Sequence, residues 1–134
     1  MTQIVSKEGF VPDAFAGVVR RSPEDHRPGA ALRLGPDADI AALAPLIETA
    51  SLIEIRFDSF ADGRGFSLAG LIRRLGFSGH LRACGPLLVD QFRAALRAGF
   101  DDIELPDEIA NRQPESQWRA VPFAGGYRER VFGA

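Results

Sequence analysis

Cysteine, lysine and long apolar runs are scarce in this chain of 134 residues. Cys84 is the single cysteine, so the chain forms no internal disulfide and holds no zinc or iron–sulfur centre made of its own cysteines alone. No apolar run approaches the roughly 20 residues of a membrane-spanning helix. Residues 1–10 also lack the basic start and apolar core of a secretory signal, so we expect a cytoplasmic protein without a membrane partner.

Basic and acidic residues nearly balance, at 16 and 18, and the net charge is -2. This composition lacks the basic character of nucleic-acid-binding proteins, so no nucleic-acid partner is expected. Lys7 is the only lysine, and the other basic residues are arginines, whose planar guanidinium suits the recognition of oxyanions. A hydrophobic fraction of 46% is typical of a folded domain with a real core.

Three stretches alternate polar and apolar residues with a period of two, and a helical pattern follows each. They are residues 52–57, 80–84 and 101–105, and a shorter strand is predicted at 31–34. Parallel strands that are buried on both faces read as continuous apolar runs, so this alternation predicts helices on one face of the sheet only. Right-handed crossovers then give four parallel βα units in the order 1-2-3-4, an α/β fold that resembles half of a closed barrel.

We expect a single domain over residues 1–134, built in three parts. Residues 1–30 are predicted to form a strand or hairpin and an exposed linker. Residues 31–110 form the βα core, and residues 111–134 form a closing helix or strand and a tail.

Helix starts within the core are predicted from capping residues and prolines. Asp37 or Asp39 is expected to cap the first helix, which Pro45 kinks or divides. Pro86 and Pro106 are natural first residues of the later helices.

The charged residues of the alternating strands share one face of the predicted sheet. We expect most of them to pair across adjacent strands. The alternative is a small enzyme in which some of them converge on a cavity and supply acid–base groups. An open polar face also needs a cover, and we expect a homodimer unless a terminal segment or another partner provides it. The residues of this face are Glu54, Arg56, His80, Arg82, Asp102 and Glu104.

A glycine-bearing loop follows the second predicted strand, at the edge where parallel sheets place their sites. Gly63 allows a ligand to approach the backbone, Ser67 is expected to cap the next helix, and Arg64 adds a guanidinium. With Arg82 as a second clamp, this arrangement predicts a site for a small oxyanion. The alternative is a simple turn in which Arg64 pairs with Asp58 or Asp62.

Several short strings carry a resemblance to an uncharacterised bacterial family, domain of unknown function nine-three-four. They are Asp62-Gly63-Arg64-Gly65-Phe66-Ser67, Leu81-Arg82-Ala83-Cys84-Gly85, Asp90-Gln91 and Gly99-Phe100-Asp101. The family is commonly labelled as an oxidoreductase of sulfite reduction. The resemblance spans about residues 31–105 and implies an accessory protein encoded near sulfite or nitrite reductase components. His80 departs from the family pattern, in which a glutamate usually stands at that place.

The resemblance also implies which residues form the site and which partners they meet. It implies a sulfite or nitrite reductase component as a partner, beside the small oxyanion that the loop residues predict. The family's aspartate, glycine, arginine and serine fall on Asp62, Gly63, Arg64 and Ser67, its second arginine and glycine on Arg82 and Gly85, and its Asp-Gln pair on Asp90 and Gln91.

The oxidoreductase label has no counterpart in the motifs of the sequence. No dinucleotide fingerprint and no haem or cluster ligand set is present, so no redox cofactor is evident. Cys84 is expected to be an inert buried thiol, and the alternative is a thiolate stabilised by a following helix start. Three functions stay open: an accessory protein that binds an oxyanion or a partner, a small enzyme using the polar face, and a structural docking subunit.

Overall fold

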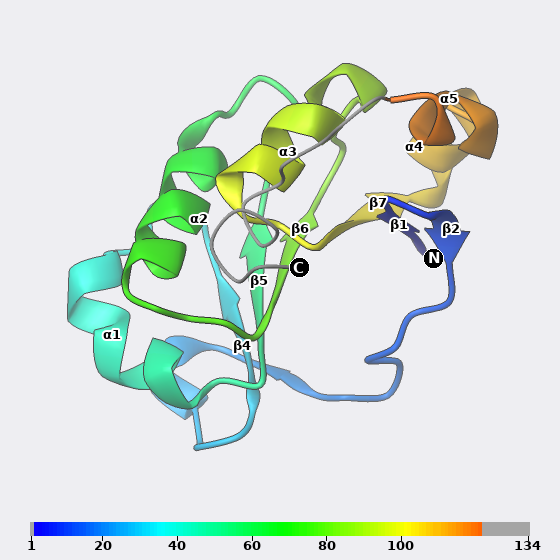
Figure 1. Ribbon diagram of the computed structural model, residues 1–134. Helices are drawn as coiled ribbons and strands as arrows, with labels where there is room; N and C mark the ends of the chain where they lie inside the picture. The colour runs from blue at the N-terminus through cyan, green and yellow to red at the C-terminus, as the bar shows by residue number, and fades with distance from the viewer. Residues whose placement is uncertain (1, 122–134) are drawn as a thin grey trace.

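The computed structural model describes residues 2–121, and its centre is a seven-stranded sheet (Figure 1). The strands are β1 (Thr2–Ser6), β2 (Gly9–Val11), β3 (Arg20–Arg21), β4 (Ala31–Leu34), β5 (Leu52–Arg56), β6 (His80–Cys84) and β7 (Asp102–Pro106). They lie side by side in the order β2-β1-β7-β6-β5-β4-β3. β3 to β7 run parallel, and the hairpin of β1 and β2 joins the β7 side antiparallel.

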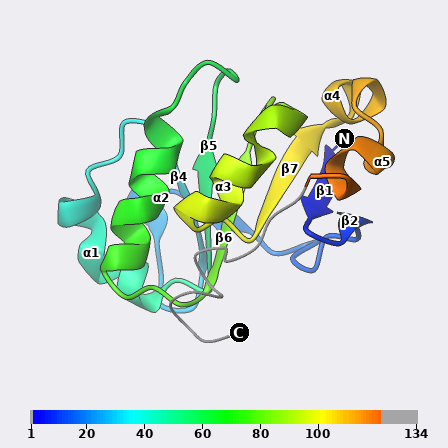
Figure 2. The same cartoon turned by 45° about the horizontal axis from the view of Figure 1, so that its top comes forward.

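Helices follow the parallel strands. They are α1 (Ile40–Thr49), α2 (Arg64–Arg74), α3 (Phe92–Ala98), α4 (Asp107–Arg112) and α5 (Glu115–Arg119). α1, α2 and α3 lie next to one another on the same face of the sheet, as two views show (Figures 1 and 2). Among residues 2–121, no helix has both the length and the apolar character needed to cross a membrane.

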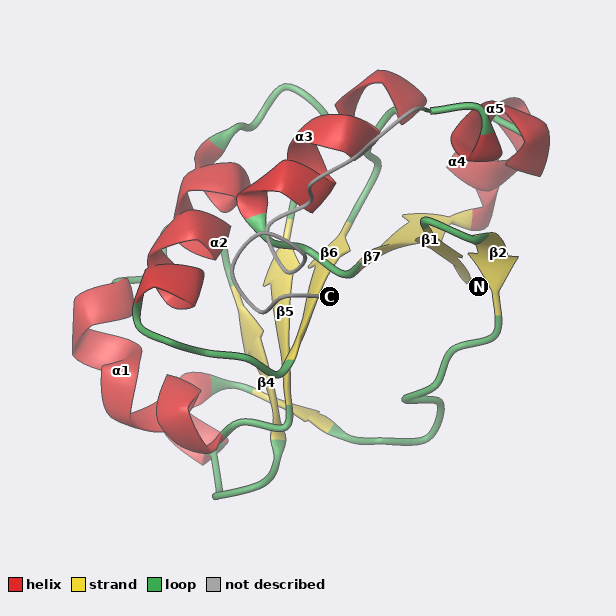
Figure 3. Cartoon of the chain, in the orientation of Figure 1, coloured by secondary structure: helices red, strands yellow, loops and turns green. Residues whose placement is uncertain are grey.

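The parallel part of the sheet contains four strand–helix units. Their strands are β4, β5, β6 and β7, which neighbour each other in chain order, each followed by a helix (Figure 3). The prediction of a mixed α/β fold with a largely parallel sheet is therefore confirmed. Curvature comparable to half a barrel stays a prediction.

The apolar side chains of the alternating strands form the core beneath the helices. Ile53, Ile55, Leu81, Ala83 and Ile103 are all fully buried in one cluster. Burying an aliphatic side chain of this size stabilises the fold by roughly 1.5–3 kcal/mol. This cluster explains why the apolar half of each alternation faces the helices and why the charged half faces the other way.

Two predicted helix starts are wrong. α3 begins at Phe92, because residues 89–91 form a separate 3-10 turn in which the Gln91 side chain accepts a hydrogen bond from the Leu88 amide. Pro86 therefore stands in a loop. α2 begins at Arg64, three residues before the cap predicted at Ser67.

The other predicted helix starts lie within one residue of the observed ones, and the first helix is not divided at Pro45. The Asp39 carboxylate accepts a hydrogen bond from the amide of Ala42 and caps α1, which continues through Pro45. Pro106 immediately precedes α4. α5 and Trp118 occupy the predicted closing segment, and the Trp118 ring packs against Phe92 at 5.3 Å between centroids.

The amino-terminal part contributes more to the sheet than predicted. The predicted hairpin is present as β1 and β2, but the expected linker starts with β3, which pairs with β4. The division of the chain into three parts is otherwise untested and stays a prediction. The predicted tail at residues 124–134 lies outside the described residues.

Residues 12–19, here called the strap, connect β2 to β3 and cover part of the polar face. The Asp13 carboxylate accepts a hydrogen bond from Arg82 at 3.0 Å, and the Phe15 ring stacks near His80 with 4.9 Å between centroids. The Arg82 guanidinium lies 5.4 Å from the Phe15 ring centre. A segment of the same chain thus provides cover that a second copy was expected to provide, and the homodimer stays a prediction.

Candidate functional site

Charged side chains form a row across the polar face of the sheet. Arg33, Glu54, Arg82 and Asp102 are register partners on β4, β5, β6 and β7. Arg33 donates Nε and Nη2 to Glu54 Oε1 at 3.1 and 2.8 Å, and Arg20 donates Nε to Glu54 Oε2 at 3.1 Å. Glu54 is fully buried, so these arginines supply the charge compensation that a buried carboxylate requires.

Arg82 is the centre of this network. It donates two hydrogen bonds to the Asp102 carboxylate, at 2.9 and 3.1 Å, and a third to Asp13. Burial by itself would lower the pKa of Arg82, but the hydrogen bonds to Asp102 and Asp13 raise it above its usual value. Arg82 therefore stays charged, and its guanidinium is already used within the fold.

His80 also pairs with a carboxylate. Its Nε2 lies 2.8 Å from Asp102 Oδ2 at the start of β6. The prediction that the charges of this face pair across adjacent strands agrees with these contacts, because His80 and Arg82 both bond to Asp102 and Glu54 bonds to arginines.

A cavity of about 340 Å³ lies where the parallel strands end, and we call it the carboxyl-edge pocket. Its position matches the general rule that parallel sheets bind ligands at the carboxyl ends of their strands. Two of its arginines are half exposed, because the side chains of Arg33 and Arg56 are 50% and 55% accessible. The lining residues are Arg33, Glu54, Arg56, Phe57, Asp58, Cys84, Gly85 and Glu104.

The two arginines of the pocket retain open hydrogen-bond donors. Arg56 donates Nε to Asp58 at 2.8 Å, and its Nη1 and Nη2 have no hydrogen-bond partner among residues 2–121. Arg33 uses Nε and Nη2 for Glu54, which leaves Nη1 open within the same part of the chain. Guanidinium donors form strong, charge-assisted hydrogen bonds to oxyanions.

Glu104 is the carboxylate of the pocket with the fewest partners. Its Oε1 lies 3.7 Å from Arg82 Nη1, and no hydrogen bond to its side chain occurs among the described residues. Burial, followed by the nearby charge of Glu54, raises the pKa of Glu104 above its usual value. Glu104 therefore holds a proton more readily than an exposed glutamate does.

Cys84 lies between Arg56 and Glu104 in the register of the sheet. Burial, and then the charges of Glu54 and Glu104, raise the pKa of the Cys84 thiol well above its ordinary value. The alternative of a Cys84 thiolate required a helix that begins directly after Cys84. No helix begins there, because α3 begins at Phe92. The thiol is therefore protonated and poorly nucleophilic, in agreement with the inert interpretation.

One set of potential metal ligands occurs among the described residues. Atoms of Glu54, Cys84 and Glu104 lie within 4.8 Å of one another. Arg33 and Arg20 already bond to Glu54, and Arg82 lies 3.7 Å from both carboxylates. These guanidinium groups favour an anion over a cation at this place.

The predicted loop site has a different geometry from the one expected. Arg64 donates Nε and Nη2 to the Asp62 carboxylate at 3.0 and 2.8 Å, as in the alternative of a simple turn. Ser67 lies inside α2, whose amino end is capped by Gly63, so the amides after Ser67 are within the helix. Arg82 is buried in its own network and does not join Arg64.

The backbone at position 85 requires glycine. Its φ is +147°, and a Cβ at this position would fall on the carbonyl oxygen of Phe57. We expect Gly85→Ala to lower the free energy of unfolding by about 3 kcal/mol or more, from backbone strain together with overpacking. Urea denaturation measures the change, and Gly70→Ala in α2, where the added Cβ meets only Arg74 at 3.7 Å, is the control. Equal stability of the two variants would contradict the requirement.

Comparison with known proteins places the chain in a family. Residues 31–132 match the profile of the family described as "Bacterial protein of unknown function (DUF934)", which is more than half of the chain. The chain belongs to this family. No curated protein and no solved structure matches the chain.

The matched range of the DUF934 family contains the whole carboxyl-edge pocket. Its lining residues fall between Arg33 and Glu104, inside residues 31–132. Asp13 and Arg20, which reach the polar face from the strap and β3, lie before the matched range. The pocket is therefore formed by the part of the chain that defines its membership of the DUF934 family.

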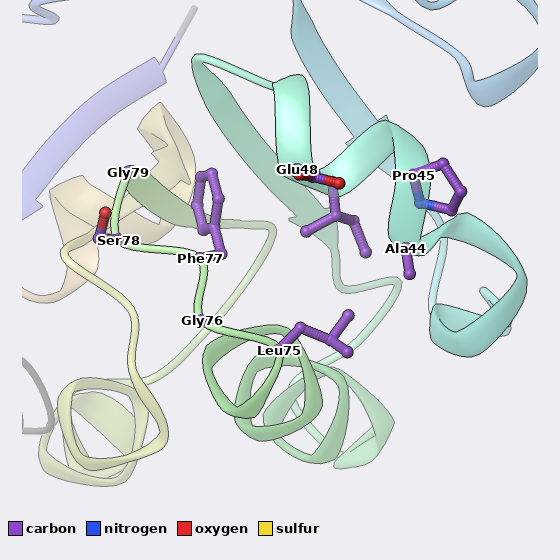
Figure 4. Close-up of a pocket in the computed structure, with 9 residues that line it drawn as sticks. Ala44, Pro45, Glu48, Leu75, Gly76, Phe77, Ser78 and Gly79 are labelled. Carbon is purple, nitrogen blue, oxygen red and sulfur yellow. The ribbon is translucent and has the colours of Figure 1, made fainter.

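A second and larger cavity, of about 570 Å³, lies between α1 and the turn after α2. Figure 4 shows Leu75 and Phe77 on one side of it and Pro45 and Glu48 on the other. Glu48 is its only lining residue with a charged side chain, and no polar cluster converges there. We therefore take the smaller, charged pocket as the candidate functional site of this DUF934 protein.

Several residues of the site were not predicted. Arg33, Asp13 and Arg20 carry the network but were not singled out, and Asp58 appeared only as a pairing partner. Arg33 stands between Leu32 and Leu34 in the predicted strand 31–34, so the period-two pattern that identified Glu54 also applied to it. Asp13 had no such signal, because it meets Arg82 across 69 positions of sequence.

Proposed function

We propose that the protein binds a small oxyanion in the carboxyl-edge pocket, as an accessory protein of assimilatory sulfite or nitrite reduction. The observation that carries the proposal is the pair Arg33 and Arg56, whose open donors lie at the rim of a cavity of about 340 Å³. Sulfite fits the chemistry of two guanidinium groups, and the resemblance of the sequence to a family labelled with sulfite reduction supports this anion.

Arg56→Ala is expected to weaken sulfite binding by about tenfold or more, because it removes charge-assisted hydrogen bonds. Isothermal titration of sulfite under anaerobic conditions measures the affinity. Arg112→Ala, an exposed arginine on α4, is the matched control and is expected to bind as the parent protein does.

Arg64→Ala, measured in parallel, distinguishes the pocket from the loop predicted from sequence. Arg64 pairs with Asp62 and lies near Asp37 and Asp58. If the anion sits in the carboxyl-edge pocket, Arg64→Ala changes the affinity much less than Arg56→Ala does. Loss of binding in Arg64→Ala alone would move the site to the loop of Asp62, Gly63, Arg64 and Ser67.

A reductase component is the proposed protein partner. Arg56 is half exposed at the rim of the pocket, so a carboxylate of such a partner would reach the same donors. Affinity purification of the intact protein from its native host, with and without Arg56→Ala, tests this. Retention of a reductase component by the parent protein alone supports the proposal, and its capture by neither protein counts against it.

A small enzyme is the second candidate, and one observation favours it. Glu104 lines the cavity and its pKa is raised by burial and by Glu54, which is typical of a group that transfers protons. His80 and Arg82 do not contribute to this candidate site, because both are paired with Asp102. Turnover of a bound anion that disappears in Glu104→Gln would favour this candidate over simple binding.

A further inference from the structure

The carboxyl-edge pocket has positive side chains at one end and a carboxylate at the other. Arg56, Cys84 and Glu104 are register partners on three neighbouring strands, with the neutral thiol in the middle. The acid end also lies close to Arg33, because atoms of Glu54, Cys84 and Glu104 lie within 4.8 Å of one another and Arg33 donates to Glu54 at 2.8 Å. A small oxyanion held by Arg33 therefore lies close to the Glu104 carboxylate.

Glu104 is the acid that such a ligand meets. Both oxygens of the other carboxylate, Glu54, already accept hydrogen bonds from Arg33 and Arg20. Glu104 has a single ion pair at 3.7 Å to Arg82 and keeps the hydrogen-bonding capacity of its oxygens toward the pocket. The charged or titratable groups that face it are Asp13, Arg20, Arg33, Glu54, Arg82 and Cys84.

A carboxylate only accepts hydrogen bonds, and so does a fully ionised oxyanion. Two such groups in one pocket repel each other unless a proton lies between them. Hydrogen phosphate brings that proton throughout the neutral range, and sulfite brings it in its hydrogensulfite form, which coexists with the dianion near neutral pH. Sulfate has none, so its binding must take a proton from solvent onto Glu104.

We propose that Glu104 makes the carboxyl-edge pocket selective for oxyanions that carry a proton over fully ionised sulfate. This inference rests on the proposed function and specifies the ligand class of the same pocket. The arginine end supplies attraction for any oxyanion, and the Glu104 end decides which of them is accepted.

Titration calorimetry of the full chain at neutral pH with sulfite, phosphate and sulfate tests the selectivity. The parent protein is expected to bind sulfite and phosphate about tenfold or more tightly than sulfate, the scale of one hydrogen bond to a charged group. Glu104→Gln replaces the charge with an amide donor, so its affinity for sulfate should rise and the preference should disappear. Glu108→Gln, an exposed glutamate of α4, should keep the parent preference.

A measurement on the parent protein alone provides a second test. Sulfate binding is expected to take up close to one proton, detected by repeating the calorimetry in buffers of different ionisation enthalpy. Its affinity should rise as the pH falls, by up to tenfold for each pH unit while Glu104 is ionised.

The outcomes separate the two proposals. If the parent protein binds none of the three anions, the proposed function is wrong and the selectivity fails with it. If it binds sulfate as tightly as phosphate without proton uptake, or if Glu104→Gln keeps the preference, the selectivity alone is overturned and oxyanion binding stands.

Discussion

Arg82→Met is expected to lower the free energy of unfolding by about 3–5 kcal/mol, the cost of breaking a buried ion pair on one side. Arg82 is completely buried, and it gives three hydrogen bonds to Asp102 and Asp13. Methionine fills a similar volume but leaves these carboxylates, and the nearby Glu54 and Glu104, with less compensating charge. Urea denaturation followed by circular dichroism measures the loss.

Arg64→Met is the control for Arg82→Met. Arg64 also pairs with an aspartate at 2.8 Å, but its side chain is 60% exposed. Exposed ion pairs contribute little to stability, so this variant should unfold almost as the parent protein does. Adding Asp102→Asn to Arg82→Met should recover part of the stability, because one uncompensated charge is removed. Equal losses in Arg82→Met and Arg64→Met would show that the network does not hold the polar face together.

The pairing of Arg82 also shows how far the sequence determines this site. Asp102 lies on the adjacent strand, and the period-two alternation placed it on the same face as Arg82. The pairing of Arg82 with Asp102 could be predicted from the alternation, because successive strands in a βα series are neighbours and their side chains alternate in direction. The contact of Asp13 with Arg82 could not be predicted, since no local pattern indicates where a connecting segment crosses a sheet.

The sequence predicted a site at the edge of the sheet where the carboxyl-edge pocket lies, but on different side chains. The rule for parallel sheets identified the carboxyl ends of the strands, where Arg56, Gly85 and Glu104 do line a pocket. The choice of Arg64 as the anion-binding residue assumed a helix that starts at Ser67. Helix boundaries depend on local capping within a few residues, and the actual start at Arg64 lets that side chain bond to Asp62 instead.

The hydrophobic periodicity predicted the core more fully than the site. The period-two alternation was enough to assign Ile53, Ile55 and Leu81 to the helix-covered face. The hydrophobic effect depends on the apolar area that is buried and not on which residues bury it. Arginine roles depend on the direction of single hydrogen bonds, which register and loop conformation set. Arg73 illustrates this, since it lies on the buried face of α2 with Leu68, Ala69 and Ile72 although its side chain is charged.

Arg73→Met is the second substitution expected to have a large effect, again about 3–5 kcal/mol. The side chain of Arg73 is fully buried, and it donates to the carbonyls of Gly99, Phe77 and Gly79 at 2.8–3.0 Å. It also bonds to Asp101 at 3.0 Å. Each buried acceptor left without its donor costs about 1–3 kcal/mol, and methionine can supply none of these hydrogen bonds.

Arg73 joins two loops through its hydrogen bonds. Gly79 lies just before β6 and Gly99 just before β7, so one guanidinium fixes the entries to two neighbouring strands. Arg74→Met is the matched control, because Arg74 is the next residue of α2 and is exposed. Its stability should change by about 0.5 kcal/mol or less. Comparable losses at both positions would mean that the effect comes from the helix, whereas a loss confined to Arg73 would assign it to the buried hydrogen bonds.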